Sequence, residues 1–308
     1  MKQDYEHHQT EKDATYAEHK HDQELRSENS DVLCASFYLQ KVLNTPYGDS
    51  VLLFHSRKYA VYNFSLYESV TRRGFCFLWG EAEAKRGASE ISTCLYRWLT
   101  SVDKLELAKT VILYCDCCSG QNRNRTVLAM LRYALVNCNY IDAVQLKFLL
   151  PGHTYMPVDS IHATVEHFVR KRIVWAPSEW ATVIRSARID PEPYTVITMT
   201  NDSFLNWSQI QRAIVPSKCC SDVDNHSLRW KSVRAIAMTK TSRKFKVRYS
   251  MLEDAVSHTF WFPQCSYLPA AKQLHRHMLP VSSLKYRISV VCVILMSFLV
   301  NSISSIMS

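Results

Sequence analysis

The segment Val111-Ile-Leu-Tyr-Cys-Asp-Cys-Cys-Ser-Gly-Gln-Asn-Arg-Asn-Arg125 governs how this chain is interpreted, because in it an apolar run ends on a single aspartate, Asp116. Such a run is typical of a buried strand, and α/β proteins place their chemistry at the carboxyl ends of such strands. We therefore predict that Asp116 lies at a functional edge of a sheet. The alternative is that it caps the helix beginning near Asn122, or accepts hydrogen bonds within the turn.

A second segment, Phe148–Glu166, begins apolar, turns at a Pro-Gly pair and continues into a helix. Asp159, His162 and Glu166 recur there at i, i+3 and i+7, which predicts that they share one helical face. Two carboxylates delivered by separate elements suggest a divalent-metal site. Asp116 and Asp159 are thus predicted to bind Mg²⁺ or Mn²⁺, helped by Glu166 or His162. A solvated helical face is the alternative for the second group.

The composition is that of a folded protein. Of 308 residues, 47% are hydrophobic and 21% are charged, which excludes a disordered chain. The formal net charge of +9 favours a polyanionic partner, either nucleic acid or an acidic membrane face. Most of the eleven cysteines sit within apolar runs, where a free thiol behaves as a small hydrophobic group. With a polar opening that lacks a signal sequence, this predicts an intracellular location, nuclear or cytoplasmic.

Residues 1–30 are polar and lack glycine and proline, which predicts a helical or disordered arm. From residue 31 the periodicity predicts strands at 32–39, 59–67 and 74–79, a helix at 89–102, a strand at 110–115, a helix at 122–136, a strand at 144–150 and a helix at 159–171. This βββ-α-β-α-β-α order is the layout of the ribonuclease H-like fold, an α/β (α+β) mixed sheet flanked by helices. We assign that fold to residues 31–190.

Residues 191–287 are predicted to form a small, basic α+β extension, with strands near 233–238 and 245–249. Within it, residues 229–248 hold eight basic side chains and no acidic one, interleaved with Trp230 and Phe245. Basic groups neutralise phosphates and aromatic rings stack on bases, so this segment is a nucleic-acid candidate. The solvent face of an edge strand is the alternative. The predicted nucleic-acid contacts, including two in the helix start after Asp116, are Arg123, Arg125, Lys231, Arg243, Lys244, Lys246 and Arg248.

Several motifs occur together in a fixed order: Tyr38-Leu-Gln-Lys-Val-Leu-Asn-Thr-Pro46, Trp79-Gly-Glu-Ala-Glu-Ala-Lys-Arg-Gly-Ala-Ser-Glu-Ile-Ser-Thr-Cys-Leu95, Asp116 with Gly120-Gln-Asn-Arg-Asn124, and Gly152-His-Thr154 with Asp159, His162 and Glu166. They resemble an uncharacterised domain family that is common in insect and other invertebrate genomes and is regarded as transposon-derived and ribonuclease H-like. The resemblance covers residues 37–194, about half of the chain. It implies descent from a mobile-element nuclease or transposase.

Tyr38 departs from the pattern of that family, whose members usually carry aspartate at this position. A ribonuclease H-like centre takes one carboxylate from the first strand, a second from the end of the fourth and a third from a later helix, and Asp116 and Asp159 match only the last two. Tyrosine is neutral at pH 7, whereas two hard cations about 3.5–4 Å apart need several anionic oxygens. The substitution is therefore expected to impair metal-dependent phosphodiester chemistry.

The chain ends in a hydrophobic tail, residues 288–308. Its first thirteen residues carry no charge, but as a helix they span only about 20 Å, short of a bilayer core of about 30 Å. Lys285 and Arg287 precede the tail, as they would in a tail anchor facing the cytosol. Tail anchoring in a membrane stays open beside a buried terminal element or a translated extension.

Two functions follow from these patterns. The first is a transposase- or nuclease-derived, ribonuclease H-like protein with impaired chemistry. The second is a non-catalytic module that keeps the fold and binds nucleic acid or another protein through its basic surface.

Overall fold

The computed structural model describes residues 2–28, 31–49, 53, 57–150, 156–216, 221–222, 226–264, 268–282 and 285. Two predicted features lie outside these residues: the Gly152-His-Thr154 turn and the hydrophobic tail 288–308. In the part that is described, no helix combines the length and the apolar character that crossing a membrane requires.

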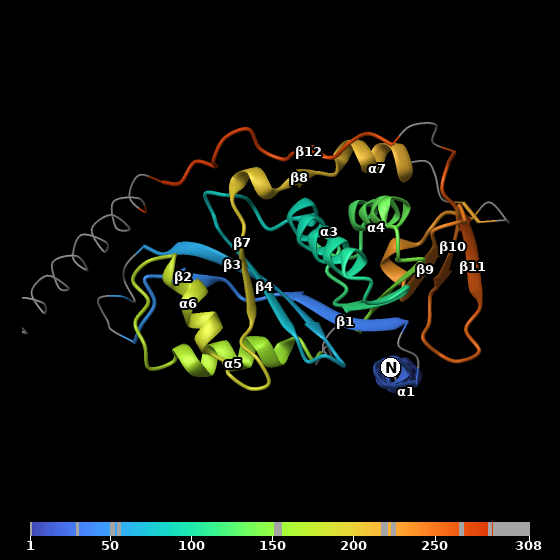
Figure 1. The fold of residues 1–308 in the computed structure, drawn as a ribbon. Helices are drawn as coiled ribbons and strands as arrows, with labels where there is room; N and C mark the ends of the chain where they lie inside the picture. The colour runs from blue at the N-terminus through green and yellow to red at the C-terminus, as the bar shows by residue number, and fades with distance from the viewer. Residues whose placement is uncertain are drawn as a thin grey trace, which may run out of the picture.

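A ten-stranded mixed sheet forms the centre of the molecule (Figure 1). Its strands are β1 (Val32–Leu39), β2 (Leu43–Thr45), β3 (Tyr59–Glu68), β4 (Gly74–Gly80), β5 (Thr110–Cys115), β6 (Ala143–Phe148), β7 (Thr195–Thr198), β9 (Ala235–Thr239), β10 (Lys244–Arg248) and β11 (Ser257–Trp261). They follow the spatial order β11-β10-β9-β6-β5-β1-β3-β4-β7, and β2 pairs separately with β3. A two-stranded sheet joins β8 (Leu205–Asn206) to β12 (Lys272–Gln273).

Helices cover both faces of this sheet. They are α1 (Lys2–Glu28), α3 (Ala88–Lys104), α4 (Arg125–Asn137), α5 (Asp159–Val169), α6 (Glu179–Ser186) and α7 (Ser208–Ile214), with short 3₁₀ turns η1 (Asn201–Ser203) and η2 (Trp230–Ser232). Figure 1 shows α3, α4 and α7 on one face and α1, α5 and α6 on the other. Each layer has its own buried cluster of side chains.

The first five long strands confirm the predicted mixed α/β layout. A short turn joins β3 to β4, and this hairpin geometry makes the pair antiparallel. Helices α3 and α4 instead provide the crossovers that parallel strands need, so β5 lies parallel to β1 and β6 parallel to β5. The resulting order β4-β3-β1-β5-β6, with β3 antiparallel to β1, is consistent with a ribonuclease H-like α+β fold.

The segment after residue 190 continues the same sheet at both ends. Strand β7 pairs in parallel with β4, while β9 pairs antiparallel with β6 and is followed by β10 and β11. Because β9 runs against β6, its first residues lie beside the carboxyl end of β6. The basic segment that contains η2 is therefore brought to the sheet edge on which Asp116 lies.

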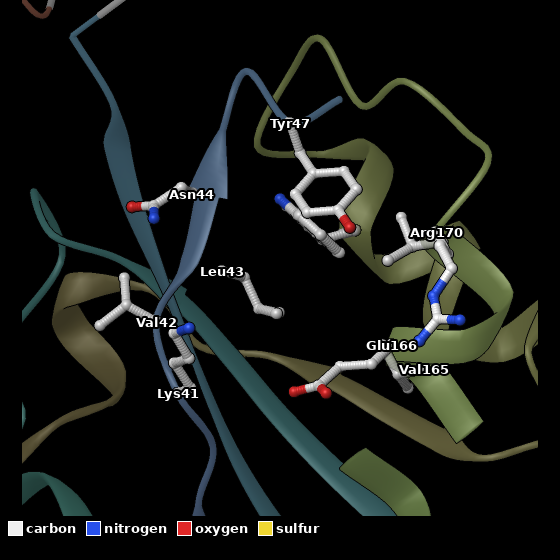
Figure 2. A pocket seen from close by; sticks show the side chains of 10 residues that line it. Lys41, Val42, Leu43, Asn44, Tyr47, Val165, Glu166 and Arg170 are labelled. Atoms are coloured by element: carbon white, nitrogen blue, oxygen red, sulfur yellow. The ribbon is translucent and has the colours of Figure 1, made fainter. Parts of the chain in front are cut away.

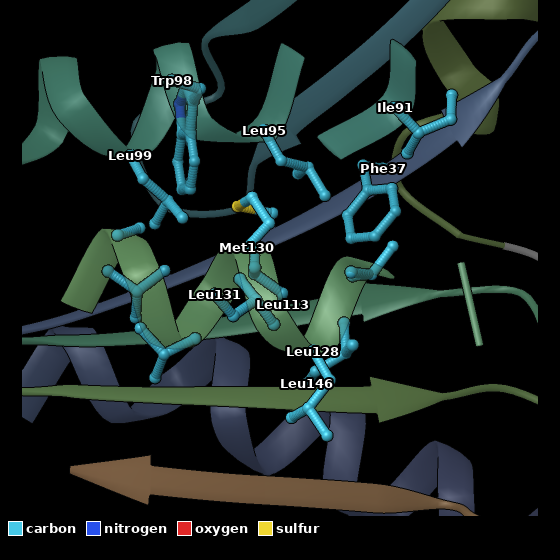
Figure 3. Close-up of a cluster of buried hydrophobic side chains, with 14 of the residues drawn as sticks. Phe37, Ile91, Leu95, Trp98, Leu99, Leu113, Leu128, Met130, Leu131 and Leu146 are labelled. Carbon is cyan, nitrogen blue, oxygen red and sulfur yellow. The ribbon is translucent and has the colours of Figure 1, made fainter. Parts of the chain in front are cut away.

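The larger core lies between the sheet and helices α3 and α4 (Figure 3). Ile91, Leu95, Trp98 and Leu99 recur at helical spacing on α3 and are buried, as the periodicity predicts. The Trp98 indole also donates a hydrogen bond of 3.1 Å to the buried Glu68 carboxylate on β3. This layer fixes β1 and β5 side by side, and with them the side chains at their carboxyl ends.

Helix α1 packs on the opposite face through polar side chains. The buried ones recur every three or four residues and therefore form one stripe: Glu11, Thr15, His19 and Asp22. Asp22 accepts hydrogen bonds of 2.5 Å from the Tyr114 hydroxyl and from Lys147 Nζ. Glu18 pairs with Lys147 at 2.5 Å and also with Arg248. The arm is thus a helix held to β6 and β10 by ion pairs and to β5 by the Tyr114 hydrogen bond.

Acidification is expected to weaken the docking of α1. Burial lowers the pKa of His19 from 6.5 to about 4, with Asp22 opposing the shift and Lys147 adding to it. The folded state keeps this ring neutral, so its contribution to stability is complete above about pH 6.5 and is lost as the pH falls toward 4. Between pH 7 and pH 5 the free energy of unfolding should fall by about 2 kcal/mol from this residue. Urea unfolding of the native chain and of His19→Gln measures the difference, and equal pH slopes would contradict it.

Candidate functional site

Tyr38, Asp116 and Asp159 all lie at the carboxyl edge of the sheet. The parallel register of β1 and β5 pairs Ser36 with Tyr114, so Tyr38 and Asp116, two residues further on, leave the sheet side by side. Burial raises the pKa of Tyr38, and the negative charges of Asp116 and Asp159 raise it further. Both carboxylates therefore lie within electrostatic range of the phenol. That Asp116 and Asp159 act together on one metal ion stays a prediction.

Asp116 makes turn hydrogen bonds through one of its two oxygens. Its Oδ1 accepts from the Cys118 N–H at 3.1 Å and from Asn122 Nδ2 at 2.5 Å. Asn124, not Asp116, caps α4, because its side chain accepts from the first backbone N–H groups of that helix. Hydrogen bonding within the turn, the alternative considered for Asp116, thus occupies Oδ1. Among the described residues Oδ2 has no hydrogen-bond donor, so this oxygen is available to a ligand.

Asp159 and His162 stand at the start of α5, against β1. Asp159 Oδ2 accepts a hydrogen bond of 2.8 Å from the Met156 N–H, and burial raises the pKa of Asp159 in spite of that bond. Burial lowers the pKa of His162 to about 4, so the ring is neutral at pH 7. Its centroid lies 5.9 Å from that of Tyr38, and Nδ1 lies 4.0 Å from Asp159 Oδ1.

Glu166 does not join this group, although it shares the helix with Asp159. Seven residues separate the two, or about 10 Å along the helix axis. Glu166 is exposed and lines a separate cavity with Tyr47 and Arg170. The residues predicted to share one helical face therefore lie at two different sites. The first turn of α5 lies at the sheet edge near Asp116, and its last turn lines the cavity.

The donor set at the edge is too small for a pair of metal ions. Among the side chains that the structure describes, no three of His, Cys, Asp or Glu converge on a point that could hold a metal. Two carboxylates beside the neutral phenol of Tyr38 do not supply the anionic oxygens that a two-metal centre needs. Binding of a single Mg²⁺ or Mn²⁺ by Asp116 and Asp159 stays a prediction.

Three cysteines border Asp116, and two of them have the spacing Cys115-x-x-Cys118, which is also found in metal and redox sites. Cys115 is fully buried, and burial raises the pKa of its thiol well above the ordinary value. Burial also raises the pKa of Cys117, whose Sγ donates to the Leu149 carbonyl at 3.0 Å. A protonated thiol is a poor metal ligand and nucleophile, so Cys115 and Cys117 act as packing groups.

Basic side chains surround the aspartates on the β6 and β9 side. Arg123 lies in the turn after Asp116, close enough to Cys117 to lower the pKa of that thiol against the effect of burial. Arg234 precedes β9, and its Nη1 lies 3.7 Å from Cys117 Sγ. Lys231 is exposed on η2, at the same end of the sheet. Arg234 was not singled out from the sequence, where it falls inside the strand predicted near 233–238; in the structure β9 begins one residue later, at Ala235.

The remaining predicted nucleic-acid contacts lie elsewhere. On β10, Phe245 and Val247 are buried and alternate with the exposed Lys244 and Lys246, which therefore point to the face that carries α1. Arg248 shares that face and is paired with Glu18 of α1. Arg243 lines a small cavity beside α4. Of the seven predicted residues, Arg123, Arg125 and Lys231 are at the Asp116 edge.

A family model described as a domain of unknown function, DUF7869, matches residues 69–246, more than half of the chain. The matched residues include Asp116, Asp159, His162 and Glu166 as well as η2 and β9; Tyr38 precedes them. No curated protein and no solved structure matches the chain.

Proposed function

The chain belongs to the DUF7869 family of domains of unknown function, and from that premise we propose that it is a ribonuclease H-like protein, derived from a mobile-element nuclease or transposase, that binds nucleic acid across the carboxyl edge of its sheet. In this proposal its metal-dependent phosphodiester chemistry is impaired. The free thiols at the described cysteines agree with the nuclear or cytoplasmic location that such a function implies.

The observation that carries the proposal is the position of Tyr38 against Asp116 and Asp159. The three side chains come from β1, from the end of β5 and from the start of α5, which are the elements that supply the carboxylates of a ribonuclease H-like centre. Two of the three positions keep their acid. The third holds a phenol whose pKa is raised by burial and by both aspartates, so it stays neutral and adds no anionic ligand.

Binding is supported by the charges that flank this edge. Arg123, Lys231 and Arg234 stand on its β6 and β9 side, and none of them has an acidic partner among the described residues. Unpaired guanidinium and ammonium groups bind phosphates and release the counterions that are condensed on the nucleic acid. The net charge of +9 favours the same partner.

Neutralising these three residues is expected to weaken nucleic-acid binding at least tenfold. The full chain and the variant Arg123→Gln/Lys231→Gln/Arg234→Gln would be titrated into a labelled 30-nucleotide single strand, with fluorescence anisotropy read at several salt concentrations. Each lost phosphate contact should lower the slope of log K against log salt by about 0.7 for a single strand.

The matched control is Lys20→Gln/Lys244→Gln/Lys246→Gln, which removes the same charge from the α1 face of the molecule. It should bind within about threefold of the native chain. The lower net charge of this variant weakens only the nonspecific attraction and leaves the contacts at the carboxyl edge intact. Equal weakening in both variants would reject the carboxyl edge as the binding surface. No binding by the native chain would reject the proposed function.

A further inference from the structure

A cavity of about 360 Å³ lies between β2 and helices α5 and α6, beyond the end of β1 (Figure 2). Its walls are apolar and aromatic, formed by Leu43, Val165, Val169 and Trp180, with Tyr47 at one side. This volume is at the lower end of the range for small-molecule sites, about 300–1,000 Å³. The cavity therefore suits a single ring system with a short polar attachment.

Charged side chains stand around its mouth. Lys41, Glu166 and Arg170 are exposed and line the cavity, and Figure 2 shows the Glu166 carboxylate directed into it from α5. Burial raises the pKa of the Tyr47 phenol; Asp49 and Glu166 raise it further, and Arg170 opposes them. Glu166 on α5 and Arg170, the residue that follows the end of α5, therefore both lie close to that hydroxyl.

The aromatic wall is held in place before any ligand arrives. The Tyr47 backbone exchanges two hydrogen bonds with Val174, of 2.8 and 3.0 Å. Its ring packs edge-on against Trp180, with 5.8 Å between the centroids and 70° between the planes. The Trp180 indole in turn donates a hydrogen bond of 2.9 Å to Thr45 Oγ1. Such a preformed wall loses little side-chain entropy when a flat ligand stacks on it.

We propose that this cavity receives one unpaired nucleobase of the strand bound at the carboxyl edge, an inference that rests on the proposed function. The base enters beside the Tyr47 ring, Lys41 and Arg170 hold the phosphates on either side of it, and Glu166 accepts hydrogen bonds from the edge of the base. Lys41 follows Tyr38 by three residues, and Glu166 follows Asp159 by two helical turns. One strand that crosses the aspartates therefore reaches both.

Glu166 gives the cavity a chemical preference. An ionised carboxylate only accepts hydrogen bonds, so it favours bases that carry an exocyclic amino group: adenine, cytosine and guanine. Thymine and uracil present a carbonyl oxygen where adenine and cytosine carry that amino group, and a carbonyl oxygen facing the carboxylate is repelled. The expected order is thus oligo(dA) and oligo(dC) bound more tightly than oligo(dT).

The test uses the full chain and labelled oligo(dA), oligo(dC) and oligo(dT) of equal length, with anisotropy as the readout and thermal melting to verify folding. The native chain should bind oligo(dC) roughly tenfold more tightly than oligo(dT), the size expected for one well-placed base contact. Glu166→Gln should reduce that preference to less than threefold, because an amide both donates and accepts. Tyr47→Leu should weaken binding of all three strands by roughly fivefold to a hundredfold through lost stacking.

A matched pair on neighbouring positions isolates the phosphate contact. Arg170 lines the cavity, whereas the adjacent Lys171, which is also exposed, does not. Arg170→Gln should weaken binding at least threefold more than Lys171→Gln. If strands bind but Glu166→Gln, Tyr47→Leu and Arg170→Gln all behave like Lys171→Gln, the cavity takes no base and only this inference is overturned. If no strand binds the native chain, the proposed function falls, and this inference falls with it.

Discussion

Replacing Tyr38 with aspartate is expected to raise metal-dependent cleavage of nucleic acid above the level of the native chain. The new carboxylate would stand within electrostatic range of Asp116, at the end of β5, and of Asp159, at the start of α5. A third acid raises the number of anionic oxygens toward the set that two divalent cations need. Affinity for Mn²⁺ should rise roughly tenfold to a hundredfold, since charge count sets affinity at oxygen-ligand sites.

Two measurements check this expectation: Mn²⁺ binding by calorimetry, and nicking of supercoiled plasmid with Mg²⁺ or Mn²⁺ present. Tyr38→Asn is the matched control, because it has the size of aspartate without its charge and opens the same space. Tyr38→Asp/Asp116→Asn should return to the native level in both assays. Equal behaviour of Tyr38→Asp and Tyr38→Asn would show that the edge is not the remnant of a metal centre.

The second large effect is expected at the ion pairs beneath α1. In Asp22→Asn, Lys147 loses one of its two carboxylate partners in a place where both Asp22 and Lys147 are almost fully buried. Removing one member of a buried ion pair destabilises by about 3–5 kcal/mol, because the remaining charge is left without full compensation. Glu18 still pairs with Lys147, so the free energy of unfolding should fall by about 3 kcal/mol.

Urea unfolding measures this loss, and Asp13→Asn serves as its control. Asp13 lies on the same helix but is exposed and accepts one local hydrogen bond, from Gln9, so its replacement should change stability by less than about 0.5 kcal/mol. The double variant Asp22→Leu/Lys147→Met should recover part of the loss, since apolar groups of similar size replace a buried pair well. A loss in Asp22→Asn no larger than that in Asp13→Asn would mean that α1 is not held by this contact.

Sequence periodicity predicts most elements of the sheet and its helices. Strand β5 occupies 110–115 and β1 occupies 32–39, as predicted, because continuous apolar runs with polar ends leave little freedom in where a buried strand begins and ends. The placement of Asp116 and Asp159 at the same edge of the sheet is predicted for a related reason: carboxyl ends of parallel strands, and the helices that follow them, lie at one edge.

Other features depend on contacts between distant parts of the chain, which periodicity does not contain. The stripe on α1 that packs against the sheet is polar, so it looks like a solvated arm until Lys147 and Arg248 are placed opposite its acids. The cavity beside Tyr47 forms only where β2 meets α5 and α6. Helical spacing correctly places Glu166 and Asp159 on the same helix, but it does not specify that β1 contacts one end of that helix and β2 the other.

The pairing of β6 with β9 has a consequence for how the chain acquires its structure. Strand β6 is synthesised well before its antiparallel neighbour, and several helices and β7 are made in between. Until residues 235–239 emerge, one side of β6 presents unpaired backbone N–H and C=O groups, the kind of border on which other strands add and nascent chains associate. The last third of the polypeptide thus covers the side of β6 that the first half leaves open. The sheet is complete only after the basic segment that contains η2 and β9 has been synthesised.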